Sequence, residues 1–324
     1  MKKYSSKDLW LALSFLSCFL LLFPCALTAA TLADESGKNW KFKLKAFYAY
    51  DDNVVNEPTD ELFRPAFLVG KDDHIFEWSA SGLIKRSFTN KLSIRADYDI
   101  DMTIHSELSQ YDLTSQIFGI GTMYKFTPLL NFMLDYKFIY NIVDGDNFSG
   151  IQYLSPSFNY MSRKFGLTRV YYTFKYSDNW LNDLRDNDQH SIGFKQYFFF
   201  SNYTKRISLG YKYTTDDTTG NSFDRDLHTI ELRGKMPLFY GIELDAEVEF
   251  TFREYVSRLG TDGSLRDDTQ HKFYLQFSKV LMQQYGFMEN LTAKLKYRYL
   301  FNDSNLLIRE YRTNRVDIGL EARF

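Results

Sequence analysis

The chain has 324 residues, of which 44% are hydrophobic and 18% aromatic, yet its mean hydropathy is −0.36. Its 39 Lys and Arg residues nearly balance its 41 Asp and Glu residues, and the basic residues follow alternate positions of extended segments instead of one surface stripe, which argues against nucleic-acid binding. Both cysteines, Cys18 and Cys25, precede residue 30, which excludes a disulfide framework, a thiol nucleophile and a thiolate metal site in the rest of the chain.

The first 30 residues have the layout of a secretory signal peptide. Three lysines within the first seven residues precede an apolar run from Leu9 to Leu27, and the small residues of ALTAA follow. This order predicts a leader that is cleaved near Ala29 or Ala30. A retained membrane anchor is the alternative, since the apolar run is long enough to span a bilayer.

From residue 40 onward, apolar and polar residues alternate in segments of about 10–14 residues. The first segment, WKFKLKAFYAY, is followed by FEWSASGLIK, LSIRADYDIDM, SQIFGIGTMYKF, LNFMLDYKFIYN, IQYLSPSFNY, TRVYYTFKYS, SIGFKQYFFF, RISLGYKYT, HTIELRGKM, IELDAEVEFTF, KFYLQFSKVL, LTAKLKYRYLF and finally RVDIGLEARF. A period of two predicts extended strands with one apolar and one polar face. We therefore expect fourteen strands.

The connections between these segments alternate between long and short. The long ones are the stretch 51–73 and then HSELSQ, VDGDNFSG, SDNWLNDLRDND, TTDDTTGNSFDRD, REYVSRLGTDGSLRDDT and NDSNLLIREYRT; the short ones are TNK, TP, SRK, SNYTK, PLFYG and MQQYGFMEN. Short turns at one end, long polar loops at the other and an even number of strands are typical of an outer-membrane barrel.

The predicted fold is all-β: a single antiparallel transmembrane β-barrel of about fourteen strands at 39–324, with short periplasmic turns and long extracellular loops. A short periplasmic segment at 31–38 would separate it from the signal peptide at 1–30. A barrel must close, because an open sheet edge would leave backbone groups unpaired in hydrocarbon. A polar interior also explains the negative mean hydropathy. A soluble protein with several packed sheets is the alternative fold.

The last ten residues, RVDIGLEARF, place Val316, Ile318, Leu320 and Phe324 on the apolar face. Together with the leader, the cysteine-free strands and the alternation of long and short connections, this segment makes the chain similar to porin-like β-barrel proteins of the Gram-negative outer membrane. The resemblance implies that these four residues form the signal read by the barrel-assembly machinery. The first strand running into YDDNVVNEP is similar to the barrel domain of surface lipoprotein assembly modifiers and to uncharacterised fourteen-stranded barrel families. Those modifiers usually carry a helical-repeat domain before the barrel, for which the leader and first strand leave no room.

If the apolar face meets lipid, the polar face lines a lumen. Closure would bring the last two strands beside the first and form a basic wall, interrupted by Asp317 and Glu321. Its members are Lys41, Lys43, Lys45, Lys294, Lys296, Arg298, Arg315 and Arg323. Two acidic ladders are expected elsewhere, one of Asp97, Asp99 and Asp101 and one of Glu243, Asp245, Glu247 and Glu249. Charged side chains that line a pore set its ion selectivity.

Two functions follow from this lumen. One is a porin-like channel for passive diffusion of small polar or charged solutes, with anions preferred near the basic wall. The other is a plugged barrel that acts in envelope assembly, export or surface binding. Small barrels are filled by side chains and large ones leave a channel, and fourteen strands lie between these cases. The connection 51–73, which mixes apolar residues with two prolines, could fold inward and narrow the pore.

A hydrolase at the barrel rim is a third and weaker hypothesis. His74 and His105 are expected near the same end of adjacent strands, close to Asp72, Asp73 and Asp101, and such groups can activate water or hold a metal. However, His74 has the lipid-facing parity and no serine stands out as a nucleophile. Loop carboxylates do not match a full calcium-binding pattern. We therefore expect no enzyme activity, no catalytic residues, no metal and no cofactor.

The expected location is the bacterial outer membrane. The expected partners are the lipid and lipopolysaccharide of that membrane, the barrel-assembly machinery during biogenesis and a small polar or anionic solute. The identity of the solute and the oligomeric state are left open by the sequence.

Overall fold

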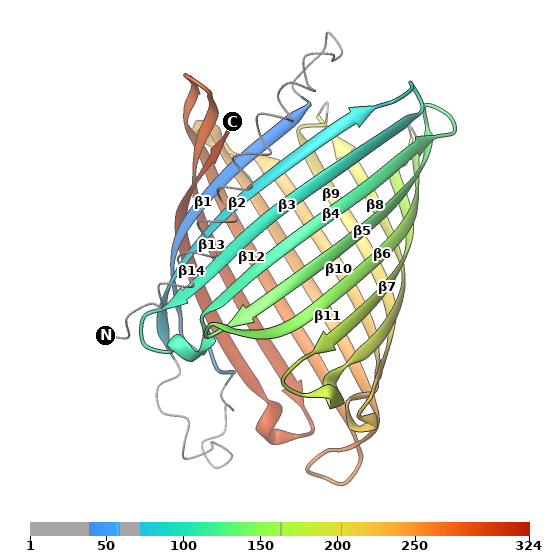
Figure 1. Ribbon diagram of the computed structural model, residues 1–324, viewed down its shortest axis with the longest axis vertical. Coiled ribbons are helices and arrows are strands. Elements are labelled where there is room, and N and C mark those ends of the chain that lie inside the picture. The colour runs from blue at the N-terminus through green and yellow to red at the C-terminus, as the bar shows by residue number, and fades with distance from the viewer. Residues whose placement is uncertain (1–38, 57, 59–71, 163, 202) are drawn as a thin grey trace.

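All fourteen predicted segments are strands of one closed antiparallel barrel in the computed structural model (Figure 1). The structure describes residues 39–56, 58, 72–162, 164–201 and 203–324. The strands are β1 (Trp40–Asp51), β2 (Asp73–Ser87), β3 (Leu92–His105), β4 (Leu113–Lys125), β5 (Leu130–Val143), β6 (Asp146–Ser162), β7 (Gly166–Asn179), β8 (Asn187–Phe200), β9 (Lys205–Thr218), β10 (Arg225–Pro237), β11 (Ile242–Leu259), β12 (Leu265–Tyr285), β13 (Met288–Ser304) and β14 (Tyr311–Arg323). The predicted fold class is confirmed, and the alternative of several packed sheets is wrong.

Short 3-10 turns are the helical elements of the described residues. Four of them, η2 (Ser109–Tyr111), η3 (Asp183–Arg185), η4 (Asn221–Phe223) and η6 (Leu307–Arg309), lie in the long connections, at the lower end in Figure 1, and η5 (Phe239–Gly241) lies in a short turn at the other end. Within the described part of the chain, no helix is long and apolar enough to cross a bilayer. The predicted signal peptide, the segment 31–38 and most of the connection 51–73 lie outside the described residues.

The barrel closes between its first and last strands. β1 and β14 pair from Lys43 opposite Arg323 to Asp51 opposite Arg315. Beyond that register, the Phe324 amide donates to the Phe42 carbonyl at 2.9 Å, and the Phe42 amide donates back at 3.3 Å. Every other strand pairs with the strands before and after it in the chain. Because the sheet is closed, no strand has an open edge whose backbone N–H and C=O groups would need hydrogen-bond partners from the surrounding solvent.

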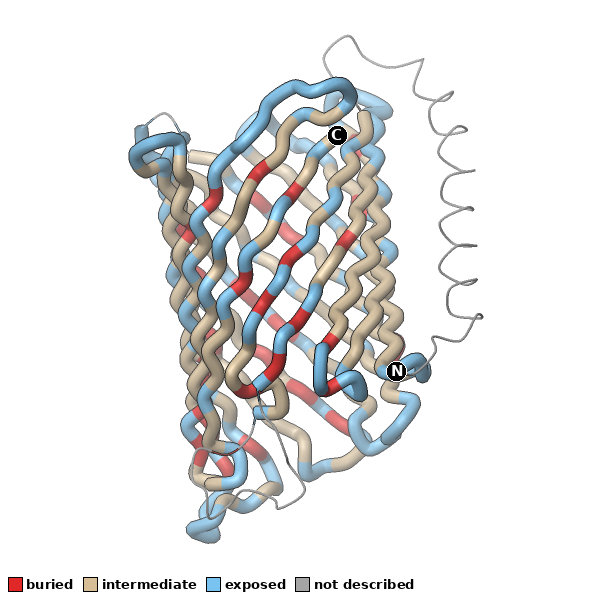
Figure 2. Tube along the Cα trace, turned by 90° about the vertical axis from the view of Figure 1, so that its left-hand side faces the viewer, coloured by how far each residue is buried: buried red, intermediate tan, exposed pale blue. Residues whose placement is uncertain are grey.

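The two faces of the wall are inverted relative to a soluble protein. Large apolar side chains such as Leu44, Phe76 and Ile120 are exposed on the outside, whereas Asp317, Glu321 and Asp268 are buried on the inside. Buried and exposed residues alternate along the strands in Figure 2. An apolar exterior around a polar interior suits a barrel whose outer solvent is hydrocarbon. The strand parity predicted from the sequence is confirmed.

Three connections are shorter than predicted. VDGDNFSG contributes only Asp144 and Gly145 to the turn between β5 and β6, with Val143 opposite Asp146. Both turn residues have positive φ, 50° and 85°, as a two-residue hairpin turn of type I′ requires. Most of REYVSRLGTDGSLRDDT and of MQQYGFMEN continues the strands β11, β12 and β13. The expected alternation of long and short connections is therefore wrong at the β5–β6 turn.

We expect Gly145→Ala to destabilise the barrel by about 1–2 kcal/mol, because a Cβ atom strains the left-handed backbone conformation. A Cβ at Gly145 would have no atom within 4 Å, so the loss reports backbone strain alone. Gly234→Ala in β10 is the matched control, because its Cβ would also have open space and its φ is not positive. Urea unfolding of the refolded barrel, followed by tryptophan fluorescence, measures both variants. An equal loss of stability in the two would contradict the turn assignment.

One side-chain pair recurs around the outside of the barrel near the long-loop end. In six of the seven hairpins formed by an odd strand and the next even strand, a tyrosine hydroxyl is hydrogen-bonded to a His, Gln or Asn side chain. We call these the belt pairs: Tyr48–His74 (2.8 Å), Tyr98–Gln116 (3.3 Å), Tyr136–Gln152 (3.2 Å), Tyr172–His190 (2.6 Å), Tyr211–His228 (2.8 Å) and Tyr297–Asn314 (2.8 Å).

The belt pairs share one register. Each polar residue lies opposite the residue two positions after the tyrosine; for example, His74 is opposite Tyr50 and His190 is opposite Phe174. In the remaining hairpin, His271 is opposite Phe250 and the tyrosine position is Val248. Amphipathic tyrosines with one end apolar and the other hydrogen-bonded suit a membrane–water interface. The belt therefore lies at one boundary of the apolar exterior.

Candidate functional site: the barrel lumen

The structure brings all eight residues of the basic wall to one side of the lumen. β13, β14 and β1 are consecutive neighbours, with Arg298 opposite Arg315 and Arg323 opposite Lys43. All eight have the inward parity. Closure of the barrel is what makes strands from the two ends of the chain adjacent, so this surface depends on the fold and not on proximity in sequence.

Part of the basic wall is ion-paired. The carboxylate of Asp317, which is fully buried, lies 2.6 Å from Arg298 and 2.9 Å from Arg315. Glu77 of β2 also contacts Arg315. The Glu321 carboxylate lies 2.6 Å from Lys294 and 2.7 Å from Arg323. Four cations of the wall are therefore held by carboxylates of their own or neighbouring strands.

The lysines of β1 form the other part. Among the residues that the structure describes, no carboxylate oxygen lies within 4.0 Å of the amines of Lys41, Lys43 and Lys45. Lys296 is placed differently, with its amine 3.4 Å from the centroid of the Phe47 ring. A lysine over an aromatic face is stabilised without a counter-charge. The unpaired cationic surface of the wall is thus centred on β1.

The acidic ladder of β11 has its own counter-charges on both neighbouring strands. Arg233 of β10 lies 2.7 Å from Asp245 and 3.1 Å from Glu247. Lys235 lies 2.7 Å from Glu243, and Lys272 of β12 lies 2.8 Å from Glu249. Two of these partners, Arg233 and Lys235, lie in the predicted strand HTIELRGKM, but strand alternation does not predict that they meet the ladder. This ladder is therefore neutralised locally, strand against strand.

The acidic ladder of β3 is built around two glycines of β4. A Cβ at Gly119 would lie 2.1 Å from an oxygen of Asp97, and a Cβ at Gly121 would lie 2.3 Å from Asp135 and 2.8 Å from Arg95. The missing side chains give space in which Arg95 reaches Asp135 at 3.0 Å and Asp97 at 3.8 Å. Asp99 and Asp101 continue the ladder with the same parity. Here too, charges of both signs lie side by side.

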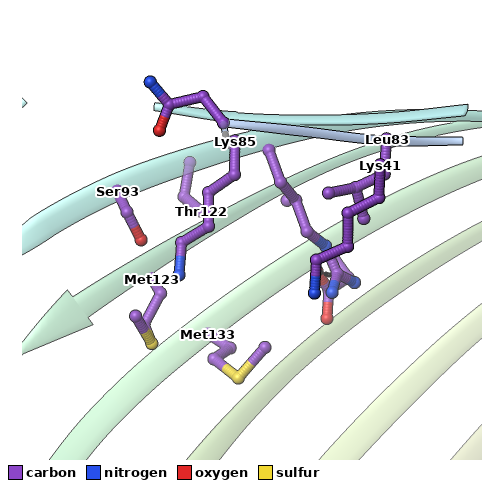
Figure 3. Close-up of a pocket in the computed structure, with 11 residues that line it drawn as sticks. Lys41, Leu83, Lys85, Ser93, Thr122, Met123 and Met133 are labelled. Atoms are coloured by element: carbon purple, nitrogen blue, oxygen red, sulfur yellow. Dashed lines mark hydrogen bonds and ion pairs between the residues drawn. The ribbon is translucent and has the colours of Figure 1, made fainter. Parts of the chain in front are cut away.

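A cavity of about 300 Å³ opens beside this cluster, at the short-turn end of β1 to β5. Its polar lining includes Lys41, Lys85 and Arg95, and its apolar lining includes Leu83, Met123 and Met133. Figure 3 shows the Lys41 and Lys85 side chains entering it from β1 and β2, with Met123 and Met133 from β4 and β5 nearby. Lys41 belongs to the predicted basic wall, but the cavity could not be predicted from the sequence because it depends on the register among five strands.

The histidines do not assemble a catalytic group. His74 points outward in a belt pair with Tyr48, whereas the buried His105 side chain lies on the inner face, with Nδ1 3.5 Å from Asp112. Opposite faces of the wall separate the two imidazoles. Among the described residues, no group of three or more His, Cys, Asp or Glu side chains is placed to hold a metal ion. The pairing on which the rim-hydrolase hypothesis depends is wrong.

The residues of the expected assembly signal lie on the outer face of β14. Val316, Ile318 and Leu320 are all exposed, Ile318 to 62%. The Phe324 ring packs against Phe42 of β1, with 5.8 Å between ring centroids. The four side chains therefore continue the apolar exterior to the short-turn end of the closing seam.

No family model matches the sequence, and no curated protein matches it. Among solved structures, OprB of Pseudomonas putida is similar, with a TM-score of 0.50 and 8% identity over 88% of this chain and 94% of that chain. The chain has the fold of an outer-membrane β-barrel. A Pseudomonas aeruginosa FadL homologue has a TM-score of 0.49 and 8% identity over 89% of this chain and 90% of its own, and an anion-selective porin from Comamonas acidovorans has a TM-score of 0.48 and 10% identity over 88% and 98%.

Proposed function

We propose that this protein is a porin-like channel of the bacterial outer membrane through which small polar and charged solutes diffuse passively. The observation that carries the proposal is the lysine row of β1. Lys41, Lys43 and Lys45 face a polar lumen and have no close carboxylate among the described residues. Unpaired charges of one sign are stable on a wall only where water solvates them. A water-filled lumen across a bilayer is a diffusion path.

The arrangement of charge favours anions in this channel. The ladder of β11 is neutralised by Arg233, Lys235 and Lys272. The field of the lumen therefore depends on the lysine row of β1 and on the ladder of β3, which lies on the other side of β2; in this proposal the lysine row, which continues the basic wall, has the larger effect. A low-dielectric wall focuses such a field into the lumen and raises the local concentration of counter-ions. In this proposal the solute is a small polar or anionic molecule, lipid and lipopolysaccharide surround the barrel, and no reaction is catalysed.

Single-channel recording tests the proposal. The refolded, leader-free protein is inserted into a planar bilayer under a salt gradient, and conductance and reversal potential are measured. A stable conductance with an anion-selective reversal potential is the expected result. A folded, heat-modifiable barrel that passes no current would overturn the channel and favour the alternative, a plugged barrel that acts in envelope assembly, export or surface binding.

The same proposal includes an assembly role for the terminal strand. We expect deletion of Phe324 to lower the amount of folded barrel in the outer membrane severalfold, because the residue ends the outward apolar row of β14 and contacts Phe42. Heat-modifiable migration of membrane fractions measures the folded amount. Phe324→Tyr is the matched control and should assemble normally. Unchanged assembly of the deletion variant would contradict the signal.

A further inference from the structure

The cavity between β1 and β5 has the chemistry of a binding site for a small amphiphilic anion. Lys41 and Lys85 enter it from neighbouring strands, in register positions where Lys41 is opposite Leu83 and Lys85 follows two residues later. Within the described structure, neither amine has a carboxylate oxygen within 4.0 Å. Two unpaired amines that share one cavity match a ligand head group with more than one negative charge.

The third cation of the cavity is already neutralised. Arg95 donates to Asp135 at 3.0 Å from a guanidinium that is about one-third exposed. This pair forms a fixed polar side of the cavity and leaves the net positive charge with the two lysines. Its position depends on Gly121, since a Cβ there would overlap both side chains. The lysines therefore determine the sign of the ligand, and the Arg95–Asp135 pair limits its size.

The rest of the lining is apolar and adaptable. Leu83 of β2 lies opposite Lys41 of β1 and two residues before Lys85, and Met123 and Met133 face each other across β4 and β5. Methionine side chains fit irregular apolar groups because they are unbranched and polarisable. A volume of about 300 Å³ lies at the small end of the range for ligand cavities. The space suits a head group with a short alkyl or similarly small apolar arm.

We propose that this cavity is a subsite for small phosphate monoesters, with the phosphate at Lys41 and Lys85 and the apolar group against Met123 and Met133. Binding at the cavity does not require a conducting pore, but the role of the subsite in solute passage rests on the proposed channel. On the orientation proposed for the barrel, the subsite lies at the periplasmic mouth of the lumen.

Calorimetric titration of the refolded barrel with butyl phosphate tests the subsite directly. Butyl phosphate is expected to bind about tenfold more tightly than inorganic phosphate, because its alkyl group is removed from water. The double variant Lys41→Gln/Lys85→Gln should lose about tenfold or more of the affinity for both ligands. Lys41→Arg/Lys85→Arg should retain it. Lys212→Gln, a lumen-facing lysine of β9 outside the cavity, is the matched control and should bind as the parent does.

The apolar part of the site has a separate test. Met133→Ser should reduce the preference for butyl phosphate over inorganic phosphate while it leaves inorganic phosphate binding unchanged. Heat-modifiable migration checks that each variant is folded. Butyl phosphate that binds no more tightly than inorganic phosphate, or equal binding by the parent and the double glutamine variant, would overturn the subsite.

Current recordings separate this proposal from the proposed channel. Butyl phosphate added on the side of the short turns should reduce the single-channel current of the parent but not of the double glutamine variant. Calorimetric binding without any current would support the subsite and overturn the channel. Current without binding would overturn the subsite and leave the channel standing.

Discussion

Replacing Lys41, Lys43 and Lys45 together by glutamate is expected to reverse the ion selectivity of the pore from anions to cations. Among the described residues, these three lysines have no carboxylate oxygen within 4.0 Å. Lys296 has none among them either, but its amine lies over the Phe47 ring, so the charge of the β1 lysines is the least compensated. A wall potential of a few kT changes local ion concentrations about tenfold. We therefore expect the ratio of anion to cation permeability, taken from the reversal potential under a salt gradient, to fall by about tenfold.

Salt dependence and a reciprocal variant make this test specific. The effect should shrink between about 0.1 M and 1 M salt, because the screening length falls from about 10 Å to about 3 Å. Asp97→Asn/Asp99→Asn/Asp101→Asn, on the other side of β2, should shift selectivity in the opposite direction. A triple glutamate variant with unchanged reversal potential would show that ions do not pass along β1.

Asp317→Asn is expected to produce a large loss of stability. The carboxylate is fully buried and holds Arg298 at 2.6 Å and Arg315 at 2.9 Å. Its removal leaves two guanidinium groups for which, among the described residues, Glu77 is the remaining carboxylate within 4.0 Å. Loss of one partner from a buried ion pair costs about 3 kcal/mol or more. Urea unfolding of the refolded barrel, followed by fluorescence, measures the change in the free energy of unfolding.

Glu243→Gln is the matched control for this substitution. Glu243 pairs with Lys235 at 2.7 Å, but its side chain is 43% exposed, and solvent-exposed pairs contribute less than about 1 kcal/mol. The Asp317 variant should therefore unfold at a clearly lower urea concentration than the Glu243 variant. If the two unfold together, the closing seam between β13, β14 and β1 does not depend on its buried carboxylate.

The strand faces could be predicted from the sequence because each face meets a different solvent. Lys41, Lys43 and Lys45 could not face hydrocarbon without a large cost in free energy. An alternation with a period of two therefore predicts both that the segment is a strand and which of its faces points to the lumen. The ion-pair partners of the lumen charges could not be predicted in the same way. That Arg233 meets Asp245, or that Arg298 meets Asp317, depends on the stagger of neighbouring strands, and the alternation alone does not determine stagger.

The connection between β5 and β6 is a two-residue turn and not the predicted long loop, although the sequence signal for a short turn is local. Asp144–Gly145 is a dipeptide that favours a two-residue turn, but the polar residues of VDGDNFSG suggested a long loop. Strand β6 begins at Asp146 although the residues there are polar. Polar side chains are tolerated in a barrel strand where they face the lumen or where the strand extends past the hydrocarbon core of the membrane. Polarity marks a loop in a soluble protein, whereas in this barrel polar residues are equally consistent with a strand.

The belt pairs bear on how the number of strands in such a barrel can change during evolution. Each pair, such as Tyr172 with His190 or Tyr211 with His228, lies inside one hairpin and needs nothing from the hairpin beside it. A hairpin that contains a belt pair therefore has its own polar–aromatic contact at the membrane interface. Duplication or loss of a whole hairpin would leave the interfacial contacts of the other hairpins unchanged. The barrel is therefore modular in units of two strands: the number of hairpins sets its circumference, and six of the seven hairpins each mark the membrane boundary with a pair of their own.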